Sequence, residues 1–244
     1  MPKTYKEQFK RLLSLTRKAV QDYDLIQEGD HVCVGVSGGK DSLTLLTVLA
    51  SLRNFYPKKF DLCAVTVSLG FPDMTFSLVT EYCQRLNVPH TIIESSIAEI
   101  VFDIRKEPNP CALCANLRRG AVNDAARKMG CNVVALAHHR DDVIETALLS
   151  LFWEGRFYCF SPNTWLDRTQ IHVIRPFIYI AEYEIKQFAE ISGLPVVFNP
   201  CPVDRSSQRA NTKNLISLIE KENKHLRTNI FGAVKRGVWP KQHQ

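Results

Sequence analysis

The sequence predicts an α/β protein with a doubly wound parallel sheet and helices on both of its faces. Short, almost continuously apolar segments alternate with longer segments of helical periodicity, which is typical of strands buried on both faces. A glycine-rich turn follows the first apolar segment, at the kind of strand end where such sheets bind ligands. The predicted strands are His31–Val36, Leu62–Val67, Pro89–Ile93, Asn132–Leu136 and His172–Ile174.

The predicted helices connect these strands, and one precedes them. The first helix covers residues 5–22 and is amphipathic. Its apolar residues recur near helical spacing at Phe9, Leu12, Leu13, Leu15 and Val20. The others are Asp41–Leu52, Thr75–Leu86, Leu113–Met129, Asp142–Phe152 and Ala181–Ile191.

The alternation stops after Pro200, where a loop and a long basic helical tail from about Gln208 are expected. The chain is therefore divided into an N-terminal helical segment (1–26), an α/β domain (27–200) and a C-terminal tail (201–244) that begins with a cysteine.

Composition and charge restrict the class of protein. The 244 residues are 45% hydrophobic and 23% charged, enough to bury a core. No apolar run approaches the roughly 18 residues needed to span a bilayer, and the N-terminus lacks a signal-peptide core. We therefore expect a cytoplasmic protein without a membrane partner. The eight cysteines are scattered, unlike those of a disulfide-rich secreted module.

Positive charge is concentrated at both ends of the chain. Residues 1–20 carry six Lys or Arg and one Glu, and residues 205–244 carry nine Lys or Arg and two Glu. The stretch between them is acidic overall. Basic ends around an acidic body favour a polyanionic partner such as nucleic acid, although solvated helix faces would give the same pattern.

The clearest motif is the glycine-rich turn Val34–Ser42, with the sequence VGVSGGKDS. Gly38 and Gly39 allow successive backbone N–H groups to point at one anion, and the helix that follows adds its positive dipole end. The hydroxyls of Ser37 and Ser42 and the ammonium of Lys40 supply further phosphate donors. These residues predict a phosphate site in which Lys40 would stabilise negative charge on the bound phosphates.

This turn is not a Walker A loop, because Val34 replaces the required first glycine and Asp41 replaces the Ser or Thr after the lysine. It resembles the pyrophosphate loop (PP-loop) of the N-type ATP pyrophosphatases, which cleave ATP between its α- and β-phosphates and adenylate a carbonyl-type oxygen. Asp41 has two interpretations, as a ligand of Mg²⁺ held against the phosphates or as a helix N-cap.

A second polar cluster, Leu136–Asp142, follows the fourth predicted strand and opens a helix. Asp141 or Asp142 could bind Mg²⁺ or orient the reacting groups, with Asp142 favoured, and Arg140 or His138 could meet developing negative charge. Either aspartate could instead only cap the helix. A zinc site is weakly indicated, because the His pair lacks further spaced ligands.

Two other positions are assigned to the nucleotide site. Arg175, before Pro176, resembles the Arg-Pro-Leu element of the same superfamily and could reach a phosphate or be a surface ion-pair partner. The segment Val65–Ser68 ends the second predicted strand, where the resemblance places the adenine. Backbone groups near Ser68 would then read the base edge.

Cysteines form a third motif, Pro110-Cys111-Ala112-Leu113-Cys114, which precedes an arginine-rich helix. This spacing allows a thioredoxin-like dithiol, a structural zinc site or an iron–sulfur cluster. The phosphate turn already occupies the first strand, which opposes the dithiol, and no second Cys-x-x-Cys supports zinc. The best third thiolate for a cluster is Cys201, between Pro200 and Pro202.

Together these motifs, with Ser206-Ser207-Gln208-Arg209 after the lone cysteine, resemble the tRNA 2-thiocytidine synthetase (TtcA-type) family over roughly residues 5–230. The resemblance implies an adenine nucleotide α-hydrolase-like fold, ATP and Mg²⁺, and a [4Fe-4S] cluster bound by Cys111, Cys114 and Cys201 that leaves one iron open for sulfide. It also implies tRNA as substrate, a sulfide donor such as a cysteine desulfurase system, and a homodimer. The other cysteines are interpreted as small buried hydrophobic residues.

The implied reaction adenylates the C2 carbonyl of an anticodon-loop cytidine and replaces its oxygen with sulfur. The basic tail and Arg105, Lys106, Arg118 and Arg119 would seat the tRNA backbone. Three alternatives stay open: a lysidine-synthetase-like ligase, a cluster-dependent sulfur transferase or desulfidase acting on another nucleoside or a small molecule, and a nucleotide-responsive RNA-binding module without turnover.

Overall fold

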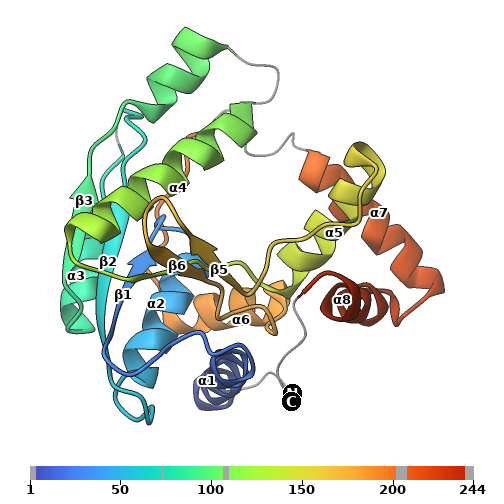
Figure 1. Cartoon of the computed structure of the whole chain (residues 1–244), viewed down its shortest axis with the longest axis horizontal. Coiled ribbons are helices and arrows are strands. Elements are labelled where there is room, and N and C mark those ends of the chain that lie inside the picture. The colour runs from blue at the N-terminus through green and yellow to red at the C-terminus, as the bar shows by residue number, and fades with distance from the viewer. Residues whose placement is uncertain (1–3, 73, 107–109, 202–207, 240–244) are drawn as a thin grey trace.

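The computed structural model describes residues 4–72, 74–106, 110–201 and 208–239. Within these ranges a six-stranded sheet has the order β3-β2-β1-β4-β6-β5 (Figure 1). The strands are β1 (Asp30–Gly35), β2 (Phe60–Val67), β3 (His90–Ile93), β4 (Val133–Ala135), β5 (Asn163–Leu166) and β6 (Ile171–Ile174). All neighbours are parallel except β5, which runs antiparallel to β6 at one edge. The predicted fold class is confirmed, with one antiparallel edge strand added.

Helices cover both faces of the sheet. They are α1 (Tyr5–Asp22), α2 (Lys40–Leu52), α3 (Ser77–Arg85), α4 (Pro110–Lys128), α5 (Arg140–Glu154), α6 (Glu182–Ser192), α7 (Gln208–Glu222) and α8 (Leu226–Gly237), with a π-helical segment η1 (Glu99–Arg105). One core cluster joins the sheet to α1, α2, α3 and α6, and the other joins it to α4 and η1. In β1, Val32 and Val34 enter the first cluster and Cys33 the second, since successive strand residues point to opposite faces.

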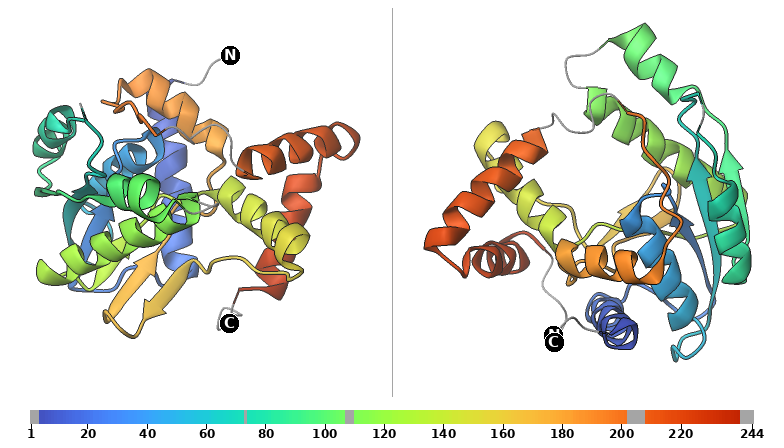
Figure 2. Two further views of the ribbon diagram at one scale, coloured as in Figure 1. Left: turned by 90° about the horizontal axis from the view of Figure 1, so that it is seen from above. Right: turned by 180° about the vertical axis from the view of Figure 1, so that it is seen from behind.

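The segments flanking the sheet are packed onto it. Helix α1 lies against α2 and α6, and its Phe9 ring stacks on Phe188 of α6. Helices α7 and α8 pack on α5, and both views of Figure 2 place the three together. Among the described residues, no helix is both long and apolar enough to cross a bilayer.

The structure differs from the sequence-based expectations in three ways, which concern the elements that form and where they begin and end. The tail forms two helices rather than one: α7 ends at Glu222, and the side chain of the next residue, Asn223, accepts a hydrogen bond from the amide of His225. Strand β5 and segment η1 were not predicted. Helix α4 begins at Pro110 rather than Leu113, so Cys111 and Cys114 lie inside its first turns; proline is well tolerated at the start of a helix.

The chain reverses its direction of travel across the sheet between β1 and β4. From β1 it proceeds outward through β2 and β3, and from β4 it proceeds to the opposite edge. In sheets of this kind the ligand crevice lies at the switch point, outside the carboxyl ends of the strands. Here β1 and β4 are neighbouring parallel strands, and α2 and α5 begin just after their carboxyl ends. Both predicted polar motifs lie at this switch point.

Candidate nucleotide and thiolate site

The glycine-rich turn has the backbone and hydrogen bonds of an anion cradle. Gly38 has a φ of +80°, which strains any other residue, and Gly39 is the N-cap of α2 without a side-chain capping bond. Ser42 Oγ accepts a hydrogen bond from the Ser37 amide at 3.1 Å and lies 3.2 Å from Ser37 Oγ. The two hydroxyls are thus held together at the start of α2, whose first amides have no side-chain cap.

A later segment of the chain covers this cradle. The amide of Val197 donates to the Gly38 carbonyl at 2.9 Å. A Cβ on Gly38 would lie 2.9 Å from Val197 Cβ, closer than packed atoms approach. The segment that leads to Cys201 is therefore fixed against the phosphate turn, four residues before the cysteine.

Lys40 and Asp41 form an ion pair at the mouth of the turn. Lys40 Nζ lies 3.1 Å from Asp41 Oδ2 and 3.3 Å from Glu182 Oε1. Burial acts to lower the pKa of Lys40, but the charges and hydrogen bonds of both carboxylates raise it above its ordinary value. Because Gly39 is the N-cap, the capping interpretation of Asp41 is wrong. Asp41 Oδ1 is buried and has no hydrogen-bond partner among the described residues, which fits a group kept for a cation.

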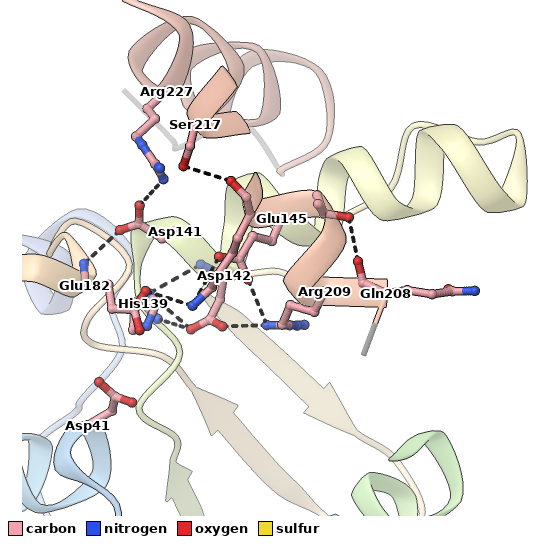
Figure 3. Close-up of polar contacts among 12 residues, drawn as sticks. Asp41, His139, Asp141, Asp142, Glu145, Glu182, Gln208, Arg209, Ser217 and Arg227 are labelled. Carbon is pink, nitrogen blue, oxygen red and sulfur yellow. Dashed lines mark hydrogen bonds and ion pairs between the residues drawn. The ribbon is translucent and has the colours of Figure 1, made fainter. Parts of the chain in front are cut away.

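The second polar cluster is tied to the C-terminal helices (Figure 3). The N-cap of α5 is His139 rather than an aspartate, and Asp142 completes a capping box by accepting from the His139 amide at 2.9 Å. The other oxygen of Asp142 lies 2.6 Å from Arg209 Nη1. Asp141 accepts from the amide of Glu182 at 2.8 Å and pairs with Arg227, so it joins α5, α6 and α8. Asp142 therefore caps its helix with one oxygen and pairs with the guanidinium of Arg209 through the other.

Sequence reasoning gave no role to Glu145, which is 1% exposed. Its oxygens lie 3.5 Å from Arg209 Nη1 and 3.7 Å from Lys213 Nζ, with no hydrogen-bond partner in the described chain. Burial raises its pKa to about 7, against the opposing charges of Lys213 and Arg209. The available signal was spacing: Asp142 and Glu145 are three apart on α5, and Arg209 and Lys213 are four apart on α7, so each pair shares a helix face.

Of the three basic residues expected at this site, His138 and Arg140 are half-buried and Arg175 is buried. Burial lowers the pKa of His138 to about 4, so it is neutral at pH 7, and its ring packs 4.9 Å from that of Phe160. Arg140 Nε is buried without a partner in the described residues. Arg175 Nη1 donates to the Ser161 carbonyl at 2.6 Å and to Thr164 Oγ1 at 3.0 Å. Arg175 is buried, so its interpretation as a surface ion-pair partner is wrong, and its phosphate role stays a prediction.

Ser68 lies just beyond the end of β2, as expected, and is buried. Its amide donates to the Ile93 carbonyl at 2.9 Å, and its carbonyl accepts from Ser95 Oγ at 2.6 Å. The amide is thus already used within the protein, and only the carbonyl retains a free lone pair for an adenine edge.

The three predicted cluster cysteines come from two parts of the chain, Cys111 and Cys114 from α4 and Cys201 from the segment after Val197. Cys111 and Cys114 are three apart on α4 and share a face of that helix. Burial raises the pKa of the Cys114 thiol, and Cys201 and Cys111 both add to this electrostatically, against an opposing effect of Arg118. Cys111 is exposed and the other two are half-buried, and none forms a disulfide.

The assignment of these three thiols to a cluster stays a prediction. Among the residues that the structure describes, no three His, Cys, Asp or Glu side chains are grouped closely enough to hold one metal ion. A [4Fe-4S] cluster makes a weaker demand on spacing, because each thiolate binds a different iron. Cys33, Cys83, Cys131 and Cys159 are buried and Cys63 half-buried, which bears out their interpretation as core residues.

Comparisons with known proteins show what the whole chain is similar to. A family model described as a PP-loop domain matches residues 5–217. The tRNA-cytidine(32) 2-sulfurtransferase of Syntrophotalea carbinolica is 39% identical over 237 residues, covering 96% of this chain and 92% of that protein. Its namesake from Pelobacter propionicus is 41% identical over 229 residues, covering 93% and 85%.

Among solved structures, the U34-tRNA thiolase NcsA from Methanococcus maripaludis, solved with its [4Fe-4S] cluster, superimposes with a TM-score of 0.74 at 22% identity. The match covers 93% of this chain and 78% of that one. At this level of identity, the likeness shows a common fold.

Proposed function

Because the chain belongs to the PP-loop family and, within it, to the tRNA-cytidine(32) 2-sulfurtransferases, we propose that it replaces the C2 oxygen of cytidine 32 in tRNA with sulfur in an ATP-dependent reaction. The C2 oxygen attacks the α-phosphorus of ATP, and the bond to the bridging oxygen breaks with release of pyrophosphate. Sulfide then adds to C2, and AMP leaves with the former base oxygen. Adenylation thus converts a poor leaving group into a good one.

The residues of the phosphate turn bind and orient ATP in this proposal. Backbone amides at the start of α2 and the hydroxyls of Ser37 and Ser42 receive the phosphates, supported by the open helix terminus. Lys40 stabilises the negative charge that develops as pyrophosphate departs. Asp142 orients the reacting groups from the adjacent strand end.

Mg²⁺ completes the nucleotide site. Asp41 would hold it through Oδ1, the buried oxygen without a partner in the described chain. Magnesium commonly takes one or two carboxylates together with substrate phosphates, so a single aspartate beside the cradle is sufficient. The ion would offset phosphate charge during attack.

A [4Fe-4S] cluster held by Cys111, Cys114 and Cys201 would leave one iron without a protein ligand and so supply a binding site for sulfide. The protein's own contribution is placement. Val197 fixes the approach to Cys201 against Gly38, and α4 presents the other two thiols from one face.

The RNA partner contacts basic surface around these thiols. Arg105, Lys106 and Arg119 are exposed and Arg118 is half-buried, and the charge of Arg118 acts on the Cys114 thiol. Part of the tail's positive charge is paired within the protein. Arg209, Lys213 and Arg227 form ion pairs with Asp142, Glu182 and Asp141, respectively. A tRNA substrate implies action in the cytoplasm. A cysteine desulfurase system as sulfide source and a homodimeric state complete the proposal.

The observation that carries the proposal is the hydrogen bond from Val197 to Gly38, since it brings the thiolate segment to the phosphate turn. The test is anaerobic reconstitution with iron and sulfide, followed by incubation with unmodified tRNA and Mg–ATP and mass analysis of the nucleosides. We expect 2-thiocytidine at position 32, dependent on ATP.

A tRNA transcript with uridine at position 32 is the matched substrate control and should stay unthiolated. In a parallel incubation with added free lysine, lysidine instead of 2-thiocytidine would assign the chain to the ligase alternative. Thiolation of free nucleosides but not of tRNA would assign it to the small-molecule alternative.

A further inference from the structure

Glu182 lies between two lysines that come from distant parts of the chain. Its Oε1 is 3.3 Å from Lys40 Nζ of the phosphate turn, and its Oε2 is 2.8 Å from Lys213 Nζ of α7. The backbone of Glu182 is itself fixed, because its amide donates to Asp141 at 2.8 Å. One carboxylate therefore connects the predicted ATP site to the C-terminal helices.

The charge of Glu182 depends on both lysines. Burial opposes its ionisation, but the hydrogen bond and charge of Lys213, with the charge of Lys40, lower its pKa to about 2. An ionised carboxylate at this position competes with a phosphate group for the ammonium of Lys40. It also repels the phosphates themselves, unless a second cation balances it.

Lys213 is placed to supply that balance. It is 42% exposed and makes its short contact with Glu182, whereas its distance to Glu145 is 3.7 Å. We propose that Lys213 and Glu182 are positioning residues for the ATP site: Lys213 neutralises Glu182 and so leaves the Lys40 ammonium available to phosphate. The inference rests on the proposed role of Lys40 in ATP binding and makes that role depend on the docking of α7.

If Lys213 acts on ATP binding only through Glu182, the effects of substituting these two residues on ATP affinity should not be additive. Without Lys213, the full charge of Glu182 acts on Lys40 and on the phosphates, and ATP affinity falls. Without the charge of Glu182, Lys213 has nothing to neutralise beside Lys40, and its removal has little effect. A lysine that touched the nucleotide directly would matter equally in both cases.

The experiment measures binding of a Mg²⁺-complexed, non-hydrolysable ATP analogue to the anaerobically reconstituted full chain without tRNA. Lys213→Met should raise the Kd about two- to fivefold, the range for partly exposed ion pairs. Glu182→Gln should bind at least as tightly as the wild type. Adding Lys213→Met to Glu182→Gln should change the Kd by less than about twofold.

Two matched controls use the same replacements at exposed positions of the same helices, Lys221→Met on α7 and Glu190→Gln on α6. Both should bind the analogue like the wild type, and melting temperatures check that every variant is folded. In turnover, Lys213→Met should raise KM for ATP more than it lowers kcat.

The inference would be overturned if Lys213→Met weakened binding of the analogue equally in the wild-type and Glu182→Gln backgrounds, or did not weaken it in the wild-type background. In either case, binding of the analogue by the wild-type chain would leave the proposed function standing. A wild-type chain that does not bind the analogue would overturn both.

Discussion

The amide of Val197 donates a hydrogen bond to the carbonyl of Gly38, at 2.9 Å, across 159 positions of the chain. This contact joins the phosphate turn after β1 to the segment that leads to Cys201. The two halves of the proposed chemistry, nucleotide activation and sulfur supply, therefore share one backbone contact. Changes at this contact should disturb both.

Gly38→Ala tests the contact. The new Cβ would lie 2.9 Å from Val197 Cβ, and the backbone would be strained at a φ of +80°. We expect the Kd for ATP to rise at least about tenfold, with a loss of stability of about 1–3 kcal/mol. Gly29→Ala is the matched control, since Gly29 has a φ of +79° but nothing within 4 Å of its Cβ position. Titration calorimetry should give a higher Kd for ATP with Gly38→Ala than with Gly29→Ala. Equal ATP affinity of the two variants would show that the Val197 contact does not shape the cradle.

Replacing Cys111, Cys114 or Cys201 by Ala should remove iron and abolish thiolation, while ATP binding survives. The reason is that a cluster with two protein thiolates is poorly retained, whereas the phosphate turn would bind ATP through its own amides, hydroxyls and ammonium. Cys83→Ala is the control: Cys83 is buried in the other core cluster, so about 1 kcal/mol of stability should be lost but no iron. Iron content and visible absorbance give the result. A Cys201→Ala protein with normal iron would contradict the three-ligand proposal.

Asp142→Asn separates catalysis from capping. Asparagine keeps an oxygen that can accept from the His139 amide, so α5 should stay capped and the melting temperature should fall only slightly. The lost charge should lower kcat about 100-fold if Asp142 orients reacting groups. Pyrophosphate release in the presence of tRNA measures this. Unchanged turnover would leave Asp142 with its capping role alone.

Glu145→Gln should change how stability depends on pH. Burial raises the pKa of Glu145 from 4.5 to about 7. Between these values, the folded chain keeps a proton that the unfolded chain has lost, so the contribution of Glu145 to stability falls as pH rises. Between pH 5 and pH 8, the free energy of unfolding of the glutamine variant should therefore rise relative to that of the wild type, by on the order of 3 kcal/mol.

Urea unfolding at the two pH values measures this difference. Exposed Glu81→Gln is the control and should show no pH-dependent gain. A constant difference between Glu145→Gln and the wild type would mean that Glu145 titrates as an ordinary carboxylate.

The sheet and its switch point could be predicted from the sequence because β1, β2 and β4 are buried on both faces and read as apolar runs. Strand β5 could not, because Asn163–Leu166 is short, only partly buried, and defined by its pairing with β6. The break between α7 and α8 likewise depends on one side-chain bond of Asn223.

The candidate site divides in the same way. The phosphate turn and Cys-x-x-Cys are local patterns, so their residues could be named from sequence. Glu145 acquires its partners only when α7 packs on α5, and Glu182 of α6 pairs with Lys40 of α2 and Lys213 of α7. No local pattern marks such long-range ion pairs. The burial of Arg175 was missed for the same reason, since its bonds to Ser161 and Thr164 come from the unpredicted β5 region.

The most direct test of the account follows the oxygen atom that sulfur replaces. tRNA carrying ¹⁸O at C2 of cytidine 32 is incubated with the reconstituted protein, sulfide and Mg–ATP, and the AMP product is weighed by mass spectrometry. Adenylation of the base predicts one ¹⁸O atom in AMP for each 2-thiocytidine formed. AMP without the label, formed alongside 2-thiocytidine, would contradict activation of the base carbonyl.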